Sequence, residues 1–213
     1  MQVVIAGGHG QIALHLERLL ADSGHRVIGL IRSRDHDSDV REAGAEPVIC
    51  DLEQEDDLSH YVQGSDAAIF AAGAGPGSGP ERKRTVDLGG AVKLLDAARR
   101  TGARRFLIIS SIGAEDPSAA GEQMRPYLEA KAEADRHVAE SDLDWTIVRP
   151  GSLTNEPGTG RVTLSTDMSL RGEVPREDVA RVLAASLGDP NTIRKTFVVV
   201  AGDTPVDEAV AAV

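Results

Sequence analysis

Short apolar runs and amphipathic stretches alternate along almost the whole chain. The amphipathic stretches predict helices near residues 11–22, 38–43, 55–62, 81–101, 121–141 and 175–187. The apolar runs predict strands at Val3–Ala6, Arg26–Ile31, Glu46–Cys50, Ala67–Ala71, Arg105–Ser110, Asp144–Val148 and Thr196–Val200. Because helical crossovers join strands that run in the same direction, this alternation predicts an α/β fold. We expect a doubly wound parallel sheet of seven strands, ordered 3-2-1-4-5-6-7, with helices on both faces.

The length of the chain favours one domain. We expect residues 1–213 to form it, because two domains of this total length would both be small. The stretch 151–172 is expected to be a short insertion on the substrate side, which gives the domain a small C-terminal capping region. Aromatic residues make up only 3% of the chain, so the core must consist of Val, Ile, Leu and Ala, as in buried parallel sheets.

Charge, cysteine content, apolar runs and histidine spacing argue against nucleic-acid and membrane partners, a disulfide and a metal site. The net charge of −11 argues against nucleic acid and anionic membranes as partners. Cys50 is the only cysteine, so we expect no disulfide within the chain and a cytoplasmic location. No apolar run is as long as a membrane span, and no histidine pair has metal-ligand spacing, so we expect neither a membrane segment nor a metal site.

Glycines follow the first predicted strand directly, in the run Gly7-Gly8-His9-Gly10-Gln11-Ile12-Ala13. In this G-x-x-G-x-x-A spacing, Gly7 permits a tight turn, Gly10 lets the backbone approach a phosphate, and Ala13 lets the helix pack closely on the sheet. The first N–H groups of a helix lack helical partners and favour an anion. Glycine also occurs in ordinary turns, but this context predicts a site for a dinucleotide diphosphate, formed by Gly7, His9, Gly10, Gln11 and Ile12.

The residue after the second predicted strand bears on which dinucleotide binds. An NAD site typically has a carboxylate there for the ribose 2′-hydroxyl. In this chain Arg32 occupies the position, and a guanidinium suits a 2′-phosphate, so the sequence predicts NADP rather than NAD. Asp35 argues the other way, although it lies farther along the chain. The alternative interpretation of Arg32 and Arg34 is solvated charge in a loop.

Two further strand ends are expected to contact the cofactor. After the third strand, Asp51 would accept a hydrogen bond from the adenine amino group and Leu52 would pack on the ring. Asp51 alternatively caps a helix that begins within 53–57. Small residues end the fourth strand and leave room for the cofactor ribose: Ala71, Ala72 and Gly73. The Gly- and Pro-rich stretch Gly73–Pro80 that follows is interpreted as a flap over the cofactor or, equally, as a plain surface loop.

A serine pair and a Tyr-x-x-x-Lys motif predict catalytic chemistry. Ser110 and Ser111 end the fifth strand, and Tyr127 and Lys131 share one face of the next helix. An ammonium near a phenol oxygen stabilises the phenolate and makes the phenol a more useful acid. Ser111 would orient a substrate carbonyl, Lys131 would also reach the cofactor ribose, and Ser110 would lie beside the cofactor. The Tyr-x-x-x-Lys motif alone is weak evidence, because both residues are common on helix surfaces. Its place after a dinucleotide loop and a serine-ended strand favours a catalytic site.

The order of these motifs resembles a known family. The glycine loop, the Ser-Ser strand end, Tyr-x-x-x-Lys and then Arg149-Pro150-Gly151 look like the short-chain dehydrogenase/reductase superfamily, which has the Rossmann fold. The run Trp145–Gly160 is most similar to its short atypical branch, whose members are NAD(P)-binding, epimerase/dehydratase-like proteins. The resemblance implies that Ser111, Tyr127 and Lys131 are catalytic. It also implies which residues meet the nicotinamide: Pro150, Gly151 and Leu153.

Departures from that family narrow the expected function. Its larger epimerases carry a substantial C-terminal domain for nucleotide sugars, which this chain lacks, so a sugar-nucleotide substrate is in doubt. The NmrA-like regulators share the fold but generally lack the catalytic tyrosine, so Tyr127 favours an enzyme. We expect an NADPH-dependent oxidoreductase, a monomer or homodimer, that reduces a small carbonyl-bearing substrate. The alternatives are an NADP(H)-sensing binding protein and a small NAD(P)-dependent epimerase or dehydratase.

Several other polar residues are interpreted as structural. Asp178 lies in the predicted helix start Val174–Ala180, where acids favour the positive end of the helix dipole. Four arginines flank the run 101–103, and cations there favour the end of the preceding helix. These arginines are Arg99, Arg100, Arg104 and Arg105.

Overall fold

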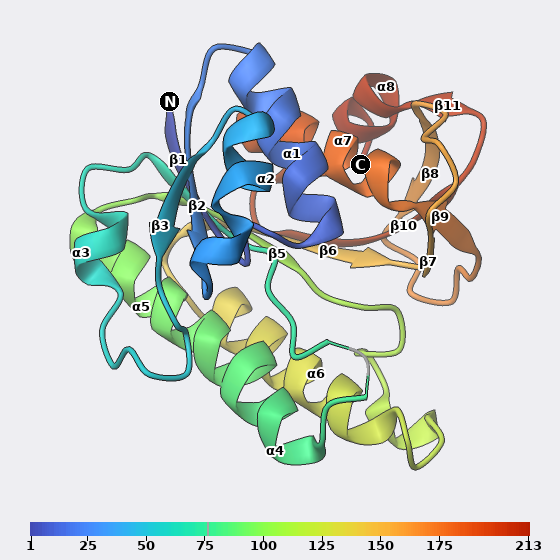
Figure 1. Ribbon diagram of the computed structural model, residues 1–213. Helices are drawn as coiled ribbons and strands as arrows, with labels where there is room; N and C mark the ends of the chain where they lie inside the picture. The colour runs from blue at the N-terminus through green and yellow to red at the C-terminus, as the bar shows by residue number, and fades with distance from the viewer. Residues whose placement is uncertain (76) are drawn as a thin grey trace.

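A nine-stranded sheet forms the centre of the computed structural model, which describes residues 1–75 and 77–213 (Figure 1). The strands are β1 (Gln2–Ala6), β2 (Arg26–Ile31), β3 (Glu46–Ile49), β4 (Ala67–Phe70), β5 (Arg105–Ile109), β6 (Asp144–Pro150), β8 (Arg161–Ser165), β10 (Lys195–Ala201) and β11 (Thr204–Pro205). Their order is β11-β8-β10-β6-β5-β4-β1-β2-β3. All neighbours from β3 to β10 pair in parallel, in the predicted order, which confirms the α/β fold class.

Two strands extend this sheet beyond the predicted seven. β8 pairs antiparallel with β10, and β11 pairs antiparallel with β8. β8 lies within 151–172, so this stretch is more than an insertion over the substrate. Val162 is the one fully buried residue of this run, and its backbone hydrogen bonds are completed by pairing with the edge of β10. Beside the main sheet, β7 (Ser152–Thr154) pairs with β9 (Glu173–Pro175).

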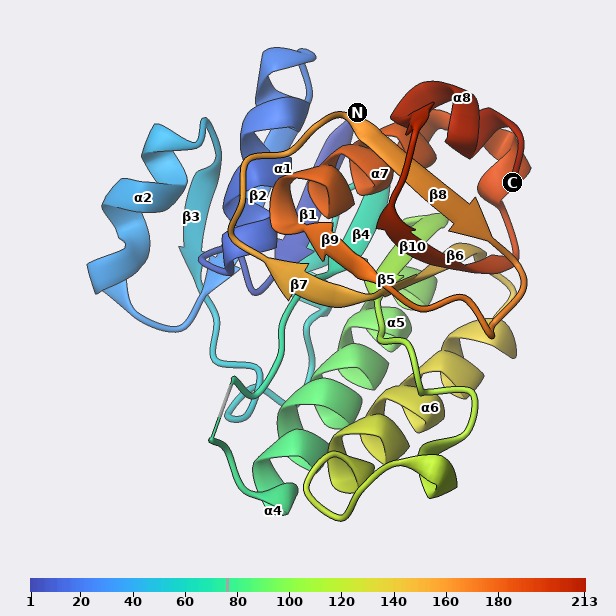
Figure 2. The same cartoon turned by 90° about the vertical axis from the view of Figure 1, so that its right-hand side faces the viewer.

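Helices cover both faces of the sheet (Figures 1 and 2). One face packs against α1 (Gln11–Asp22), α2 (Asp37–Glu42), α7 (Arg176–Gly188) and α8 (Val206–Ala211). The other packs against α3 (Ser59–Val62), α5 (Ala91–Thr101) and α6 (Arg125–Ala139). In β1, Val3 and Ile5 join the first core and Val4 and Ala6 the second, so the strand is apolar throughout. No helix in the described ranges has the length and hydropathy to cross a membrane.

Two predicted helices differ from expectation. The helix expected over 55–62 forms only at α3, because Asp51 and Asp57 accept hydrogen bonds from the backbone N–H groups two residues ahead and hold the chain in turns. The helix expected over 81–101 is a continuous path of changing geometry: α4 (Pro80–Arg82), the π-helical η2 (Lys83–Gly90) and α5. Short 3-10 turns complete the structure at η1 (Arg34–His36), η3 (Pro117–Ala119) and η4 (Pro190–Thr192).

Arg105 does not cap the helix that precedes it, contrary to the sequence interpretation. Its side chain is buried and donates hydrogen bonds to the carbonyl oxygens of Ser186, at 2.6 Å, and Leu187, at 3.3 Å. Another hydrogen bond reaches Oγ1 of Thr192, at 2.8 Å. Arg105 therefore satisfies the last carbonyl groups of α7, a helix far away in the sequence.

Candidate active site

Two adjoining cavities open at the carboxyl ends of the central strands. The smaller, of about 320 Å³, lies between the glycine loop, the end of β2 and the turn after β3. The larger, of about 510 Å³, reaches from the start of α1 to α6. Residues 71–75, which follow β4, line both. Open α/β sheets bind ligands at this edge, and two joined cavities suit the two halves of a dinucleotide.

The glycine loop borders the smaller cavity and leads into α1. Gly7 has a φ of +84°, and a Cβ atom there would lie 2.6 Å from the Cα atom of Ala72, so only glycine fits. Gly10 and Gln11 are exposed, Ile12 is buried, and the first N–H groups of α1 have no acceptors within the helix. The first turn of this helix holds no acidic side chain. The loop therefore fits the diphosphate of a dinucleotide.

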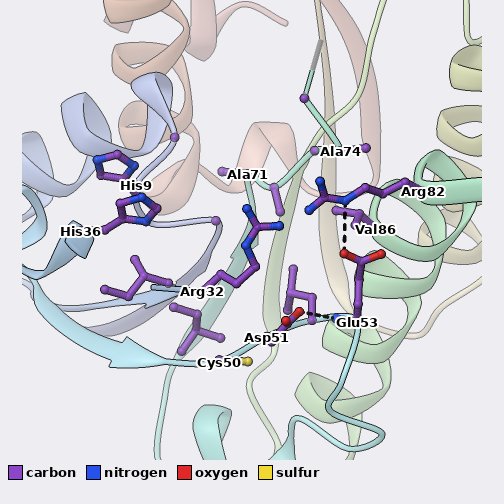
Figure 3. A pocket seen from close by; sticks show the side chains of 18 residues that line it. His9, Arg32, His36, Cys50, Asp51, Glu53, Ala71, Ala74, Arg82 and Val86 are labelled. Carbon is purple, nitrogen blue, oxygen red and sulfur yellow. Dashed lines mark hydrogen bonds and ion pairs between the residues drawn. The ribbon is translucent and has the colours of Figure 1, made fainter. Parts of the chain in front are cut away.

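Two arginines reach into the smaller cavity (Figure 3). Arg32, after β2, and Arg82, in α4, point into it from opposite sides. Nε of Arg82 lies 3.2 Å from a carboxylate oxygen of Glu53, whereas Arg32 projects into the space itself. Because Asp51 and Glu53 also line the cavity and Glu53 pairs with Arg82, the guanidinium that the cavity offers at the place predicted for the 2′-substituent of the adenosine ribose is that of Arg32.

The ring of His9 does not face the phosphate position. Its Nε2 atom is hydrogen bonded to Oδ2 of Asp39, at 2.8 Å, and its ring stacks on His36 with 3.6 Å between the ring centres. The hydrogen bond from His9 holds the pKa of Asp39 below its usual value. His9 thus contributes its backbone to the loop, while its ring and His36 form one wall of the cavity (Figure 3).

The turn after β3 lines the other side of the smaller cavity. Oδ1 of Asp51 accepts a hydrogen bond from the backbone N–H of Glu53, at 2.9 Å, so this carboxylate stabilises the turn. Leu52 is buried and lines the cavity, as a ring-packing residue must. Burial raises the pKa of Cys50 to about 12, which keeps this thiol protonated and unreactive.

The larger cavity gathers the residues predicted for catalysis. Ser111 follows β5, Tyr127 and Lys131 lie on α6, and all three line this cavity. The parallel pairing of β5 with β6 brings the serine to the same edge as Gly151. The cavity also contains other residues from the sequence prediction: Ile12, Ala71, Ala72, Gly73, Ser110, Pro150 and Leu153.

Lys131 is buried beneath the ring of Tyr127. Its Nζ atom lies 5.8 Å from the ring centre, donates a hydrogen bond to the carbonyl of Ile109 at 3.0 Å, and is 3.3 Å from Oδ1 of Asp87. Burial lowers the pKa of Lys131, but attraction to Tyr127, Asp87 and Asp135 outweighs it, and the pKa lies above its usual value. The lysine is therefore an ammonium ion held against the aromatic ring.

The two serines differ in what their hydroxyl groups contact. Ser110 is buried and donates to Oδ2 of Asp135, at 2.8 Å, and the same oxygen accepts hydrogen bonds from Nε and Nη2 of Arg149, at 3.0 and 2.9 Å. Burial raises the pKa of Asp135 in spite of these partners. Ser111 is half-buried and donates to the carbonyl of Ile112, at 3.0 Å. Of the pair, Ser111 has the hydroxyl that a substrate can reach.

The stretch Gly73–Pro80 borders both cavities. Gly73, Ala74 and Gly75 line both of them, and Gly77 and Ser78 line the larger one. The N–H of Ala74 donates to Oδ2 of Asp87, at 3.1 Å, which anchors the start of the stretch to η2. The flap predicted here includes Pro76, which lies outside the described residues.

Comparison with known proteins places this site in a family. The sequence matches the NAD(P)H-binding family over residues 7–190. The chain belongs to this family. The match begins at the glycine loop and takes in both cavities, and it confirms the resemblance to atypical short-chain dehydrogenases/reductases.

Similar proteins align with this chain over almost its whole length. It is 38% identical over 211 residues to "Uncharacterized sugar epimerase YhfK" of Bacillus subtilis, and the alignment covers 98% of both chains. A solved structure from Bacillus halodurans, provisionally named as an NAD-dependent epimerase/dehydratase, is 40% identical with a TM-score of 0.95, over 100% of both chains. The oxidoreductase ylbE of Lactococcus lactis is 26% identical with a TM-score of 0.87, over 100% of this chain and 96% of that one.

Several residues that line the two cavities were absent from the sequence prediction, among them Arg82, His36 and Asp87. Arg82 and His36 lie on short helices without a recognisable motif. The sequence does contain an indication of Asp87, because this acid occurs among the apolar residues of a buried helical face. An acid on such a face is rarely buried without a partner, and here the partner is Lys131.

Proposed function

We propose that this member of the NAD(P)H-binding family is an NADPH-dependent reductase of a small carbonyl compound. The observation that carries the proposal is the larger cavity, in which Ser111, Tyr127 and Lys131 line one space with Gly151. The glycine loop and Arg32 border the cavity next to it. A hydroxyl, a phenol and a buried ammonium ion thus lie together where the sheet would present a nicotinamide.

The bound cofactor would supply a hydride to the carbonyl carbon and leave as NADP⁺. Ser111 would donate a hydrogen bond to the carbonyl oxygen and fix its position. Tyr127 would transfer its phenol proton to that oxygen, so that the product is an alcohol and the residue is left as a phenolate. The positive charge of Lys131 beneath the ring stabilises this phenolate until solvent returns the proton.

Tyr127→Phe tests the proposal. The change keeps the ring over Lys131 and removes the transferable proton, so we expect kcat to fall by about 10²-fold or more. The measurement is NADPH oxidation over a panel of small aldehydes and ketones. Tyr61→Phe is the matched control, because the other tyrosine of the chain donates to Glu55 and lines neither cavity.

Two outcomes of this assay would overturn a part or the whole of this proposal. Full turnover by Tyr127→Phe would show that the phenol is not the proton donor. Tight NADPH binding by the wild-type protein, with no turnover on any compound of the panel, would favour an NADP(H)-sensing binding protein.

An epimerase or dehydratase is the second candidate, favoured by the names of the Bacillus relatives. Such an enzyme returns the hydride within each turnover, so the cofactor is not consumed and stays bound. Protein that retains NAD through exhaustive dialysis, and that oxidises no NADPH with the carbonyl panel, would replace the reductase with this alternative. Release of the cofactor on dialysis would favour the reductase.

A further inference from the structure

Asp87 lies between the catalytic helix and the loop that borders both cavities. Its side chain is 1% exposed and projects from the π-helical segment η2. Oδ1 lies 3.3 Å from Nζ of Lys131, and Oδ2 accepts the hydrogen bond from the N–H of Ala74, at 3.1 Å. A Cβ atom at Gly73 would lie 3.3 Å from Oδ1, so the carboxylate packs directly under this loop.

The ammonium of Lys131 depends on this carboxylate for its charge partner. Around Nζ lie the ring faces of Phe70, at 5.6 Å, and Tyr127, at 5.8 Å, and the carbonyl of Ile109. The other nearby acid, Asp135, uses its Oδ2 atom for Ser110 and Arg149. Within the described ranges, Asp87 is the acid that forms an ion pair with Lys131.

We infer that Asp87 is the positioning residue of this site: it keeps Lys131 charged and in place beneath Tyr127, and through Ala74 it joins the lysine to the loop that lines both cavities. The importance of this pair for turnover rests on the proposed reductase. The pair itself does not depend on any substrate.

The physical reason is the free energy of burying a charge. A lone ammonium in an apolar interior tends to lose its proton, whereas one held by a carboxylate and a carbonyl oxygen keeps it. Asp87 also makes the pair neutral overall, so the lysine acts on the phenol as one half of a dipole. The π-helical geometry of η2 is a common feature of functional sites, and here it carries the carboxylate.

Lysine-selective carbon-13 NMR tests this role directly. The signal of Lys131, identified by its loss in Lys131→Arg, is followed against pH in the wild type and in Asp87→Asn. We expect the midpoint of its titration to fall by about one pH unit or more in Asp87→Asn. Burial lowers the pKa of Lys131, and the variant lacks the attraction to the Asp87 carboxylate that opposes this effect. The same midpoint in both proteins would overturn the inference, since a purely structural Asp87 is replaced by Asn without loss of shape.

The connection to the loop is tested by comparing Asp87→Asn with Asp87→Ala. Asn keeps an oxygen that accepts from the N–H of Ala74, and Ala does not. Fluorescence titration with NADPH should therefore show a several-fold weaker affinity for the Ala variant than for the Asn variant. Equal affinities would show that the hydrogen bond to Ala74 does not position the loop for cofactor.

Asp178→Asn is the matched control for a buried acid. Asp178 is fully buried, accepts hydrogen bonds from the N–H groups of Thr159 and Gly160, at 2.9 and 2.8 Å, and lines neither cavity. The Asp178→Asn substitution should leave the titration of Lys131 unchanged. A shift of the same size in this control would mean that loss of any buried acid, and not of the ion pair, moves the lysine.

Loss of folding in Asp87→Asn would also be informative. A double variant with Lys131→Met removes both charges, and replacing a whole buried pair is far less costly than breaking it. Recovery of thermal stability in the double variant would support the ion pair between Asp87 and Lys131. A double variant as unstable as Asp87→Asn would overturn the inference. Because neither the NMR nor the folding measurement uses a substrate, a positive result stands even if the wild-type protein turns over no compound of the carbonyl panel.

Discussion

Arg32 and Arg34 are two arginines of one loop with different surroundings. Both side chains are exposed, but Arg32 lines the smaller cavity and points into it, whereas Arg34 is not among the residues that line it. From sequence alone, both have the same alternative interpretation as solvated loop charge. Because only Arg32 of the two lines the cavity, Arg32 is the better partner for a 2′-phosphate.

Arg32→Ala should therefore weaken NADPH binding by about tenfold or more and leave NADH binding nearly unchanged. The loss of hydrogen bonds to a charged phosphate costs about 1.5–3 kcal/mol, and NADH lacks that phosphate. Competitive fluorescence titration of both cofactors measures the difference, with Arg34→Ala as the control that should bind both as the wild type does. Equal affinity of the wild type for NADPH and NADH would remove the NADP assignment.

Among the elements, α1 combines an amphipathic helix with one buried acid. Glu17 is fully buried on its packed face, and neither carboxyl oxygen has a hydrogen-bond partner among the described residues. A Cβ atom at Gly8 or Gly29 would lie 2.8 or 2.5 Å from Oε1, so the two glycines make room for this carboxyl group. Burial raises the pKa of Glu17 to about 8, so it is protonated at neutral pH behind the glycine loop.

Glu17→Gln should make the stability of the protein less dependent on pH. In the unfolded chain Glu17 ionises near pH 4.5, whereas in the folded protein it keeps its proton to about pH 8. Between these values the unfolded state releases a proton first, so the free energy of unfolding falls as pH rises, by up to about 1.4 kcal/mol per unit. Denaturant unfolding at both ends of this range should show that decline in the wild type and its loss in Glu17→Gln.

Glu42→Gln provides the control for this measurement. Glu42 is exposed at the end of α2, so its substitution should preserve the decline. Glu17→Gln with the same pH dependence as the wild type would contradict a protonated, buried Glu17.

At the scale of the whole molecule, Arg105 joins elements that are distant in sequence. From β5 it donates to carbonyl groups at the end of α7 and to Thr192, in η4. It also donates to Oγ1 of Thr146, in β6, at 2.8 Å. Burial lowers the pKa of Arg105 to about 10, which still leaves it charged at neutral pH. The C-terminal part of the chain, including β10 at the edge of the parallel strands, is thus attached to the centre of the sheet.

Arg105→Met should lower the free energy of unfolding by about 3 kcal/mol or more, because buried carbonyl and hydroxyl groups lose their donor. For a chain of this size, this corresponds to a fall in Tm of at least about 6 °C. Arg104→Met is the neighbouring control: its side chain is 57% exposed, and the change should stay within about 0.5 kcal/mol. Similar losses in the two variants, measured by thermal unfolding, would show that Arg105 has no special role.

Much of the fold and of the candidate site followed from local patterns. The alternation of strands and helices, the glycine run and the Tyr-x-x-x-Lys spacing each depend on residues close together in the chain. Parallel strands align their carboxyl ends, so these patterns were enough to bring Gly10, Ser111 and Tyr127 to one edge of the sheet. The strand order and the family were correctly predicted for the same reason.

Packing between distant segments settled the rest. β8 is a strand because β10 has a free edge, and Arg105 is buried because α7 ends above it. Lys131 has Asp87 as its charge partner because η2 packs against α6. Local spacing carries no information about such partners, since a buried charge or an edge strand is stabilised by groups that only the folded chain brings within a few ångströms.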